Sequence, residues 1–340
     1  IIELMKMPHA SVWPPLFINR TPLLITLLLI TSVHALAADW PMWRADASRR
    51  GTSAGELPAE LYLQWTLELP KPDAAWPAEQ EKLQFDRLYE PVLAGKRLFV
   101  PSMISDKLTA FDTDSGKELW RFYTNGPVRF SPAIWKDKIF IICDDGYLYC
   151  LGTADGSLVW KFRGGPSERR VLGNDRLIST WPARGGPVVY DDKIYFGAGI
   201  WPFMGIFLHA LDAETGRLIW SNSGEGSSFQ TQQHGSPAFS GIAPQGYLAA
   251  NEDFLVVSGG RTMPAVYDRK TGAVKHYDVS ARNMGTKGGG GYDVVLGENF
   301  YLNRGCVYRL DNGKFITKLD AMLVNEHSII CHDGDGLRGF

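Results

Sequence analysis

Three side chains that can carry positive charge stand at the same place in successive stretches of the chain. Each lies three residues before a proline that opens a β-rich segment: Arg129 before Pro132, Arg184 before Pro187, and His234 before Pro237. Positive charges gathered at one place attract an anion. We therefore interpret the three as a partial basic rim that takes a carboxylate-bearing ligand or an acidic peptide.

The opposing interpretation is that these cations serve no ligand. Cations at such a rim are often solvated or paired with acids, and Glu90 and Asp293 are the candidates here. Two further stretches lack the cation, because Leu88 occupies the place before Pro91 and a glycine-rich run, Gly285 to Gly291, replaces it later in the chain. Both interpretations stay open from the sequence.

Other patterns give weaker indications of chemistry. The stretch from Lys287 to Gly291 lacks the residue order of a phosphate-binding loop. His234 and Ser236 lack the G-x-S-x-G elbow of a nucleophile. No Cys and His spacing matches a zinc site, so we predict no metal site. The insertion spanning residues 163–184 is the best candidate for a functional loop.

The four cysteines are too few for a disulfide scaffold. Cys143 and Cys150 flank an Asp145-Gly146 pair that predicts a two-residue hairpin turn, which places Cys143 opposite Leu148. The two sulfurs are then diagonal neighbours, an arrangement that fits disulfide geometry poorly. A bridge is one alternative, and buried free thiols are the one that the geometry favours.

Composition describes a folded, strand-rich chain. The 340 residues carry 35 Lys+Arg against 37 Asp+Glu, a formal charge of −2 that removes the electrostatic case for nucleic-acid binding. The 36 Gly, 20 Pro and 11 Trp indicate many tight turns between aromatic segments, which favours strands over a helix bundle.

The N-terminal residues have the pattern of an export signal. Lys6 and Arg20 precede an apolar run from residue 23 to 33, and small residues around Ala37 resemble a cleavage site. The run is shorter than the roughly 20 residues that a spanning helix needs. We predict that residues 1–37 are a signal peptide, with 1–4 a non-coding extension, and that the product is periplasmic or secreted with no membrane span after cleavage.

Internal repetition is the strongest signal in the sequence. The stretches 108–120 and 208–220 both fit the pattern A-x-D-x-x-[ST]-G-x-x-x-W, and degraded copies occupy 150–160, 265–276 and 307–319. The glycines of the five copies are Gly116, Gly156, Gly216, Gly272 and Gly313. Their separations are typical of propeller blades, with insertions in two of them.

Each copy predicts the last two strands of a four-stranded blade, and the proline-led segment predicts the first. The first strand of a blade is innermost, so the cations before the prolines should lie near one mouth of the central channel. Trp120, Trp160 and Trp220 should pack between neighbouring blades. The stretch Leu63 to Leu69 resembles a lone fourth strand that completes the last blade and closes the ring.

The end of the chain resembles the first half of a blade. Residues 328–340 are similar to residues 139–151 and stop before the turn and the tryptophan strand. We therefore predict that residues 38–340 form five blades and an incomplete sixth, a fragment of a 7- or 8-bladed ring.

The repeat pattern, together with the opening Asp39-Trp-Pro-Met-Trp-Arg44, resembles the pyrroloquinoline-quinone-like (PQQ-like) β-propeller repeat family of exported bacterial proteins. The resemblance implies an all-β propeller of four-stranded antiparallel blades. It is specific for fold and weak for activity, because the family includes quinoprotein dehydrogenases, an outer-membrane assembly lipoprotein and proteins of unassigned role.

The resemblance leaves two functions open. Quinoprotein dehydrogenases of the family hold calcium beside the quinone and use a central Asp with a disulfide between adjacent cysteines. This sequence has no adjacent cysteine pair, and we carry over no catalytic residue. We expect a binding or scaffold module that takes a protein or a small acidic ligand at the channel mouth. The alternative is an oxidoreductase that uses PQQ with calcium to oxidise alcohols or sugars.

Overall fold

The computed structural model describes the chain in several stretches, and all statements below concern them. They are residues 2–6, 39–53, 55, 59–173, 175–224, 228–231, 235–279, 290–319, 321–324, 328–333 and 336–339. Most of the expected signal peptide lies outside this part of the chain. Its residues Ile2–Lys6 form strand β1, which pairs antiparallel with β2 (Tyr62–Leu67).

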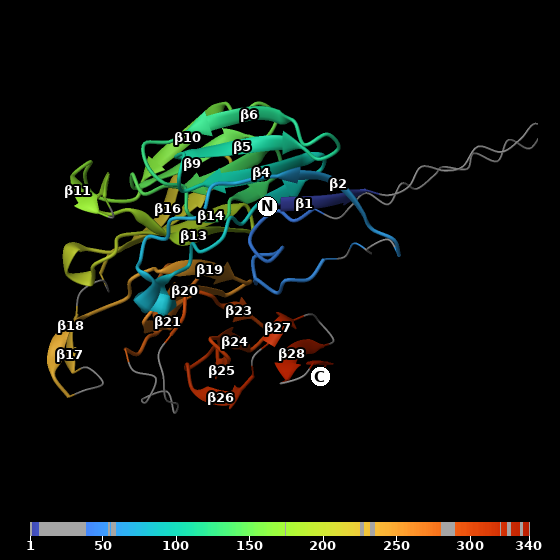
Figure 1. Ribbon diagram of the computed structural model, residues 1–340. Coiled ribbons are helices and arrows are strands. Elements are labelled where there is room, and N and C mark those ends of the chain that lie inside the picture. The colour runs from blue at the N-terminus through green and yellow to red at the C-terminus, as the bar shows by residue number, and fades with distance from the viewer. Residues whose placement is uncertain are drawn as a thin grey trace, which may run out of the picture.

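Five four-stranded antiparallel blades follow one another along the chain (Figure 1). Blade one consists of β3 (Val92–Ala94), β4 (Arg97–Ser102), β5 (Lys107–Asp112) and β6 (Glu118–Tyr123). Blade two consists of β7 (Ala133–Trp135), β8 (Lys138–Ile142), β9 (Tyr147–Gly152) and β10 (Leu158–Arg163). Blade three consists of β13 (Ala183–Tyr190), β14 (Lys193–Ala198), β15 (Phe207–Asp212) and β16 (Leu218–Asn222).

The C-terminal part continues the pattern. Blade four consists of β19 (Gly246–Ala250), β20 (Phe254–Gly259), β21 (Thr262–Asp268) and β22 (Val274–His276). Blade five consists of β23 (Val295–Leu296), β24 (Phe300–Asn303), β25 (Cys306–Arg309) and β26 (Phe315–Lys318). A three-stranded sheet follows, made of β27 (Ala321–Val324), β28 (Ile329–Asp333) and β29 (Gly336–Gly339). The all-β propeller expected from the repeats is confirmed.

Two hairpins and two short helices stand outside the blades. The hairpins are β11 (Arg170–Gly173) with β12 (Arg176–Ser179) and β17 (Ser228–Thr231) with β18 (Pro237–Ser240), and both project to the side in Figure 1. The helices are the 3-10 segments η1 (Ala78–Leu83) and η2 (Pro202–Met204). The sequence assigned Pro237 to the inner strand of blade four, which was wrong, because the first strand of that blade is β19.

Adjacent blades are held together by the tryptophan of one copy and the glycine of the next. Each motif glycine has positive φ, and a Cβ at Gly216, for example, would stand 2.7 Å from the ring of Trp160. The Trp160 indole Nε1 donates to the Glu214 carbonyl at 3.1 Å. Trp65, Trp120 and Trp220 repeat both contacts. The predicted inter-blade role of Trp120, Trp160 and Trp220 is confirmed. The expectation that the stretch Leu63 to Leu69 completes the last blade is not, because β2 pairs with β1 and, among the described residues, with no strand of a blade.

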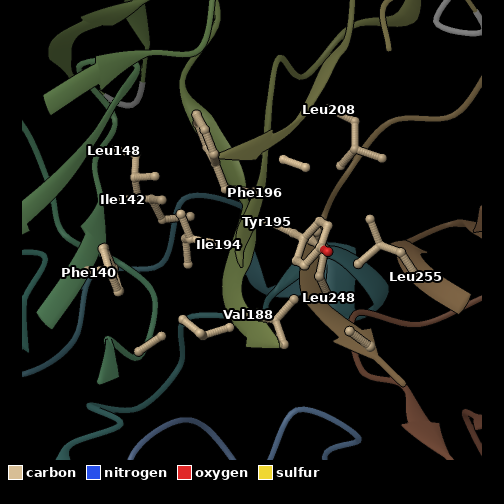
Figure 2. Close-up of a cluster of buried hydrophobic side chains, with 14 of the residues drawn as sticks. Phe140, Ile142, Leu148, Val188, Ile194, Tyr195, Phe196, Leu208, Leu248 and Leu255 are labelled. Atoms are coloured by element: carbon tan, nitrogen blue, oxygen red, sulfur yellow. The ribbon is translucent and has the colours of Figure 1, made fainter. Parts of the chain in front are cut away.

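Blades two, three and four share one hydrophobic core cluster. Figure 2 shows side chains from blades two, three and four meeting there, among them Phe140, Tyr195, Phe196 and Leu248, all buried. The inner strands β13 and β19 pair in parallel at Gly185 with Gly246. A Cβ on Gly185 would lie 2.6 Å from the Leu248 side chain, so only glycine permits this approach.

The segment Trp40–Arg50, here called the strap, crosses the inner strands of successive blades. Its backbone forms hydrogen bonds with one residue from each of five inner strands: Leu93, Ile134, Ala250, Leu296 and Val324. We call this the strap end of the blades. The opposite end, at which β7, β13, β19 and β23 begin, is the mouth end.

Within the described residues, the chain has no helix that is long and apolar enough to cross a membrane.

Candidate functional site

Arg129 lies just before β7 at the mouth end and is held by two carboxylates. Its Nε donates to Asp144 Oδ2 at 2.7 Å, and its Nη1 donates to Asp86 Oδ2 at 2.7 Å. Nη1 also donates to the Asp73 carbonyl at 2.7 Å. Only 4% of Arg129 is exposed, and Asp86 and Asp144 are equally buried. Buried charges require such pairing, since an isolated ion in the protein interior is costly.

Arg184, at the start of β13, joins the same cluster. Its Nη2 donates to Asp144 Oδ2 at 3.0 Å, and its guanidinium lies over the Phe85 ring at 5.5 Å. Its Nε and Nη1 are buried and have no acceptor among the described residues, and Asp86 Oδ1 is likewise without a donor. The buried cluster of Asp86, Arg129, Asp144 and Arg184, here called the ion cluster, therefore retains unused hydrogen-bonding capacity.

Local turn geometry positions the two aspartates. β8 and β9 pair with Ile142 opposite Leu148, so the loop between them has three residues after Cys143, with Gly146 at φ 90°. The expected two-residue turn was wrong by one register step. The longer loop turns the Asp144 carboxylate toward the arginines, whereas Asp86 follows η1 and accepts from the Ala75 backbone N–H at 2.9 Å.

Burial and pairing oppose each other in the electrostatics of the ion cluster. Burial raises the pKa of Asp86, although Arg129 and Arg184 act against it. Burial acts to lower the pKa of Arg129, but Asp144 and Asp86 together outweigh it and raise that pKa. For Arg184, burial dominates and lowers the pKa. The ion cluster is thus two cations compensated by two carboxylates rather than an exposed basic surface.

An aromatic layer fills the space between the ion cluster and the strap. Phe85 stacks on Phe130 with centroids 4.4 Å apart, and Phe130 meets Tyr247 edge-on at 5.2 Å. Trp43 of the strap stacks on Tyr247 at 4.0 Å. Its indole Nε1 donates to Glu90 Oε1 at 3.0 Å, and burial raises the Glu90 pKa to about 8.

An open cavity of about 680 Å³ adjoins the ion cluster at the mouth end. It lies between the η1 segment and blade five, and Arg87 in its wall directly follows Asp86 in the chain. Its charged lining residues are Glu81, Lys82, Arg87, Asp293, Arg304 and Lys318. Gly291, the last residue of the glycine-rich run, lines its wall.

The structure brings together two of the three cations that the sequence singled out. Arg129 and Arg184 share Asp144, but their charges are buried and paired. His234 lies outside the described residues, and the strand from which its place was counted, β18, belongs to a hairpin outside the blade. The sequence missed Asp86, two residues before the exposed Leu88 that was aligned instead.

The residues at this site do not fit the quinone and calcium that the resemblance implies for dehydrogenases. Phe130 and Tyr247 are buried and meet edge-on with ring centroids 5.2 Å apart. All four cysteines are free thiols. The part of the chain that the structure describes contains no group of three or more His, Cys, Asp or Glu side chains able to hold a metal ion.

Comparison with known proteins places the chain among propellers of this kind. Residues 32–198 and 144–320 match the family model described as outer membrane protein assembly factor BamB. The chain is similar to the tetrathionate hydrolase of Acidithiobacillus ferrooxidans, with 27% identity over 191 residues, 53% of this chain and 32% of that protein. It is also similar to quinohemoprotein alcohol dehydrogenase ADH IIB of Pseudomonas putida, with 28% identity over 242 residues, 63% of this chain and 30% of that protein.

Solved structures agree on the fold. A europium-containing methanol dehydrogenase superposes with a TM-score of 0.54 at 15% identity, over 85% of this chain and 60% of that one. At that identity the likeness extends to the fold alone. The chain spans about a third or less of the length of the two curated relatives named above.

Proposed function

Because the chain belongs to the PQQ-like repeat family represented by the BamB model, we propose that it is an exported propeller that acts as a binding or scaffold module at its mouth end. The observation that carries this proposal is the ion cluster. Arg129 ties the Asp73–Asp86 segment to the β8–β9 loop, so its buried ion pairs hold these segments of the mouth end in fixed positions. A mouth that is fixed in advance loses little conformational freedom when a partner binds.

The ligand that we propose is acidic, either a small molecule or part of a protein. Arg184 is the member of the predicted rim with donors to spare, because its Nε and Nη1 are buried without an acceptor. An arginine fork in that condition is suited to a carboxylate. Arg129, by contrast, already donates hydrogen bonds from Nε and Nη1 to two carboxylates and a carbonyl.

The second candidate is a quinone-dependent oxidoreductase. The similarity to the Pseudomonas putida alcohol dehydrogenase, which spans 63% of this chain, favours it. Against it stands the donor set, because the described residues contain no group of three or more His, Cys, Asp or Glu side chains that could hold the calcium.

Loading the purified protein with PQQ and calcium tests the two candidates. We expect no change in the quinone absorbance and no dye-linked oxidation of alcohols or sugars above a control without protein. Turnover that depends on protein, quinone and calcium together would overturn the proposal in favour of the enzyme.

A further inference from the structure

Four cationic side chains from separate segments surround the cavity at the mouth end. Lys82 belongs to η1, Arg87 follows it, Arg304 lies in the β24–β25 turn, and Lys318 ends β26. Since β24 and β26 run in the same direction within blade five, both deliver their cation to the same end of the blade.

Among the described residues, these cations lack carboxylate partners. In the described part of the chain, none of the four forms a salt bridge, and Arg87 Nε donates only to the neutral Gln84 Oε1 at 2.6 Å. Two carboxylates, Glu81 and Asp293, also line the cavity, so cations outnumber acids four to two. The local field therefore favours an anion.

Lys82 is close enough to Arg304 for the two charges to repel each other. Burial lowers the pKa of Lys82 most, and the charges of Arg304 and Arg261 lower it further. Like charges held together without a counter-ion are unfavourable, and an anion placed among them relieves that repulsion.

Arg304 occupies a backbone conformation that its side chain does not favour. Its φ is 47°, followed by Gly305 at 69°, which are the left-handed values of a tight hairpin turn normally supplied by Asn-Gly or Gly-Gly. In blade four, the turn between β20 and β21 has Gly260 with φ 61°. An arginine in this position brings backbone strain that Gly260 avoids in blade four.

The opposite wall of the cavity is fixed to the same turn. Asn303 Oδ1 accepts from the Gly291 backbone N–H at 3.0 Å, and Asn303 Nδ2 donates to the Asp293 carbonyl. Asn303 is buried, so these hydrogen bonds hold the Gly291–Asp293 wall against the turn that carries Arg304. The cavity is thus held in shape before any ligand arrives.

We propose that this cavity binds a small polyanion, a molecule that carries two or more carboxylate or phosphate groups, with Arg304 as the central contact. A volume of about 680 Å³ lies within the range of small-molecule pockets. The guanidinium forks of Arg87 and Arg304 suit either oxyanion. The inference rests on the proposed binding function and specifies its ligand class, in a cavity beside the ion cluster.

Isothermal titration of the full chain with citrate and with pyrophosphate tests the proposal, with acetate as the single-charge control. We expect binding of at least one polyanion, no comparable binding of acetate, and a dissociation constant raised about tenfold or more in Arg304→Gly, as for loss of a charge-assisted contact. The more tightly bound probe identifies the ligand as a carboxylate or a phosphate. The urea midpoint of Arg304→Gly should equal or exceed that of the unchanged chain, because glycine relieves the strained φ.

Lys136→Gly is the matched control. Lys136 also has a left-handed φ, 53°, and lies in the β7–β8 turn at the strap end, so its replacement makes the same change in charge and backbone far from the cavity. Unchanged polyanion binding in Lys136→Gly supports the site. Equal weakening by both variants, or no effect of Arg304→Gly, overturns it.

Failure of this inference and failure of the proposed function are separable. Quinone-dependent turnover overturns the binding-module proposal whether or not citrate binds. If the protein neither binds a polyanion nor shows turnover, only the cavity assignment is overturned. The binding-module proposal then stands with a protein as the partner.

Discussion

Two buried arginines hold the two ends of the propeller in opposite ways. Arg49, in the strap, donates to three backbone carbonyls, those of Trp43, Pro187 and Leu248, at 2.8–2.9 Å. Arg129, at the mouth, is held mainly by two carboxylates. Both side chains are almost fully inaccessible.

Their pKa values record the difference. Burial lowers the pKa of Arg49 to about 9, because carbonyl dipoles compensate its charge less fully than carboxylates would. The pKa of Arg129 is raised by Asp144 and Asp86 in spite of burial. The comparison shows that the strap end is a hydrogen-bonded latch between blades, whereas the mouth end is held by ion pairs between two buried arginines and two buried carboxylates.

The largest effect should come from Arg129→Met. It leaves Asp86 and Asp144 buried with only Arg184 to compensate them, and breaking a buried pair in this way costs about 3–5 kcal/mol of unfolding free energy. Urea unfolding measures it. The double variant that adds Asp86→Asn keeps Arg184 paired with Asp144 and should recover much of the lost unfolding free energy. A loss below about 1 kcal/mol in the single variant would contradict the ionic character of the mouth end.

Arg49→Met should cost less, about 2–3 kcal/mol, because it leaves three buried carbonyls without donors but no unpaired charge. The adjacent Arg50→Met is the control, since Arg50 is partly exposed and paired with Asp46 at 2.6 Å. The Arg50→Met variant should lose no more than about 1 kcal/mol of unfolding free energy. Equal losses of unfolding free energy in Arg49→Met and Arg50→Met would show that Arg49 does not latch the blades together.

Glu90, between the two ends, gives the smallest effect, which depends on pH. The folded protein keeps the Glu90 proton up to about pH 8, whereas the group titrates near 4.5 when unperturbed. Between these values the folded state binds more protons, so this group makes stability fall as pH rises. As the pH rises from 5 to 8, the unfolding free energy of Glu90→Gln should therefore increase by about 1 kcal/mol or more relative to that of the unchanged chain.

Taking the difference between the two proteins cancels other groups, such as His209, whose pKa burial lowers to about 4 and which acts with the opposite sign between pH 4 and 6.5. Parallel stability curves for Glu90→Gln and the unchanged chain would show that Glu90 ionises normally.

The sequence predicted the blades because their signals are local. A glycine with positive φ recurs in all five copies, and in three of them a tryptophan follows four residues later. Each of these tryptophans packs on the glycine of the next copy, as Trp160 does on Gly216. Even His276, which replaces the tryptophan in one copy, keeps the hydrogen bond by approaching the Leu310 carbonyl at 3.0 Å.

The site was predicted only in part because its geometry is not local. Counting from prolines found Arg129 and Arg184, which share Asp144, but it failed at Pro237, since an inserted hairpin can also start with proline. The pairing partner Asp86 comes from a loop without repeat character. The cations of the cavity, such as Arg304, come from turns that sequence spacing does not relate to one another.

Hydrogen–deuterium exchange of the full chain, with and without saturating citrate or pyrophosphate, tests most directly the central claim that the mouth end binds and the strap end latches. We expect added protection at residues 81–87 and 290–305 and none at residues 40–50. Protection confined to the strap, or none at the mouth with a ligand that is bound, would contradict the account.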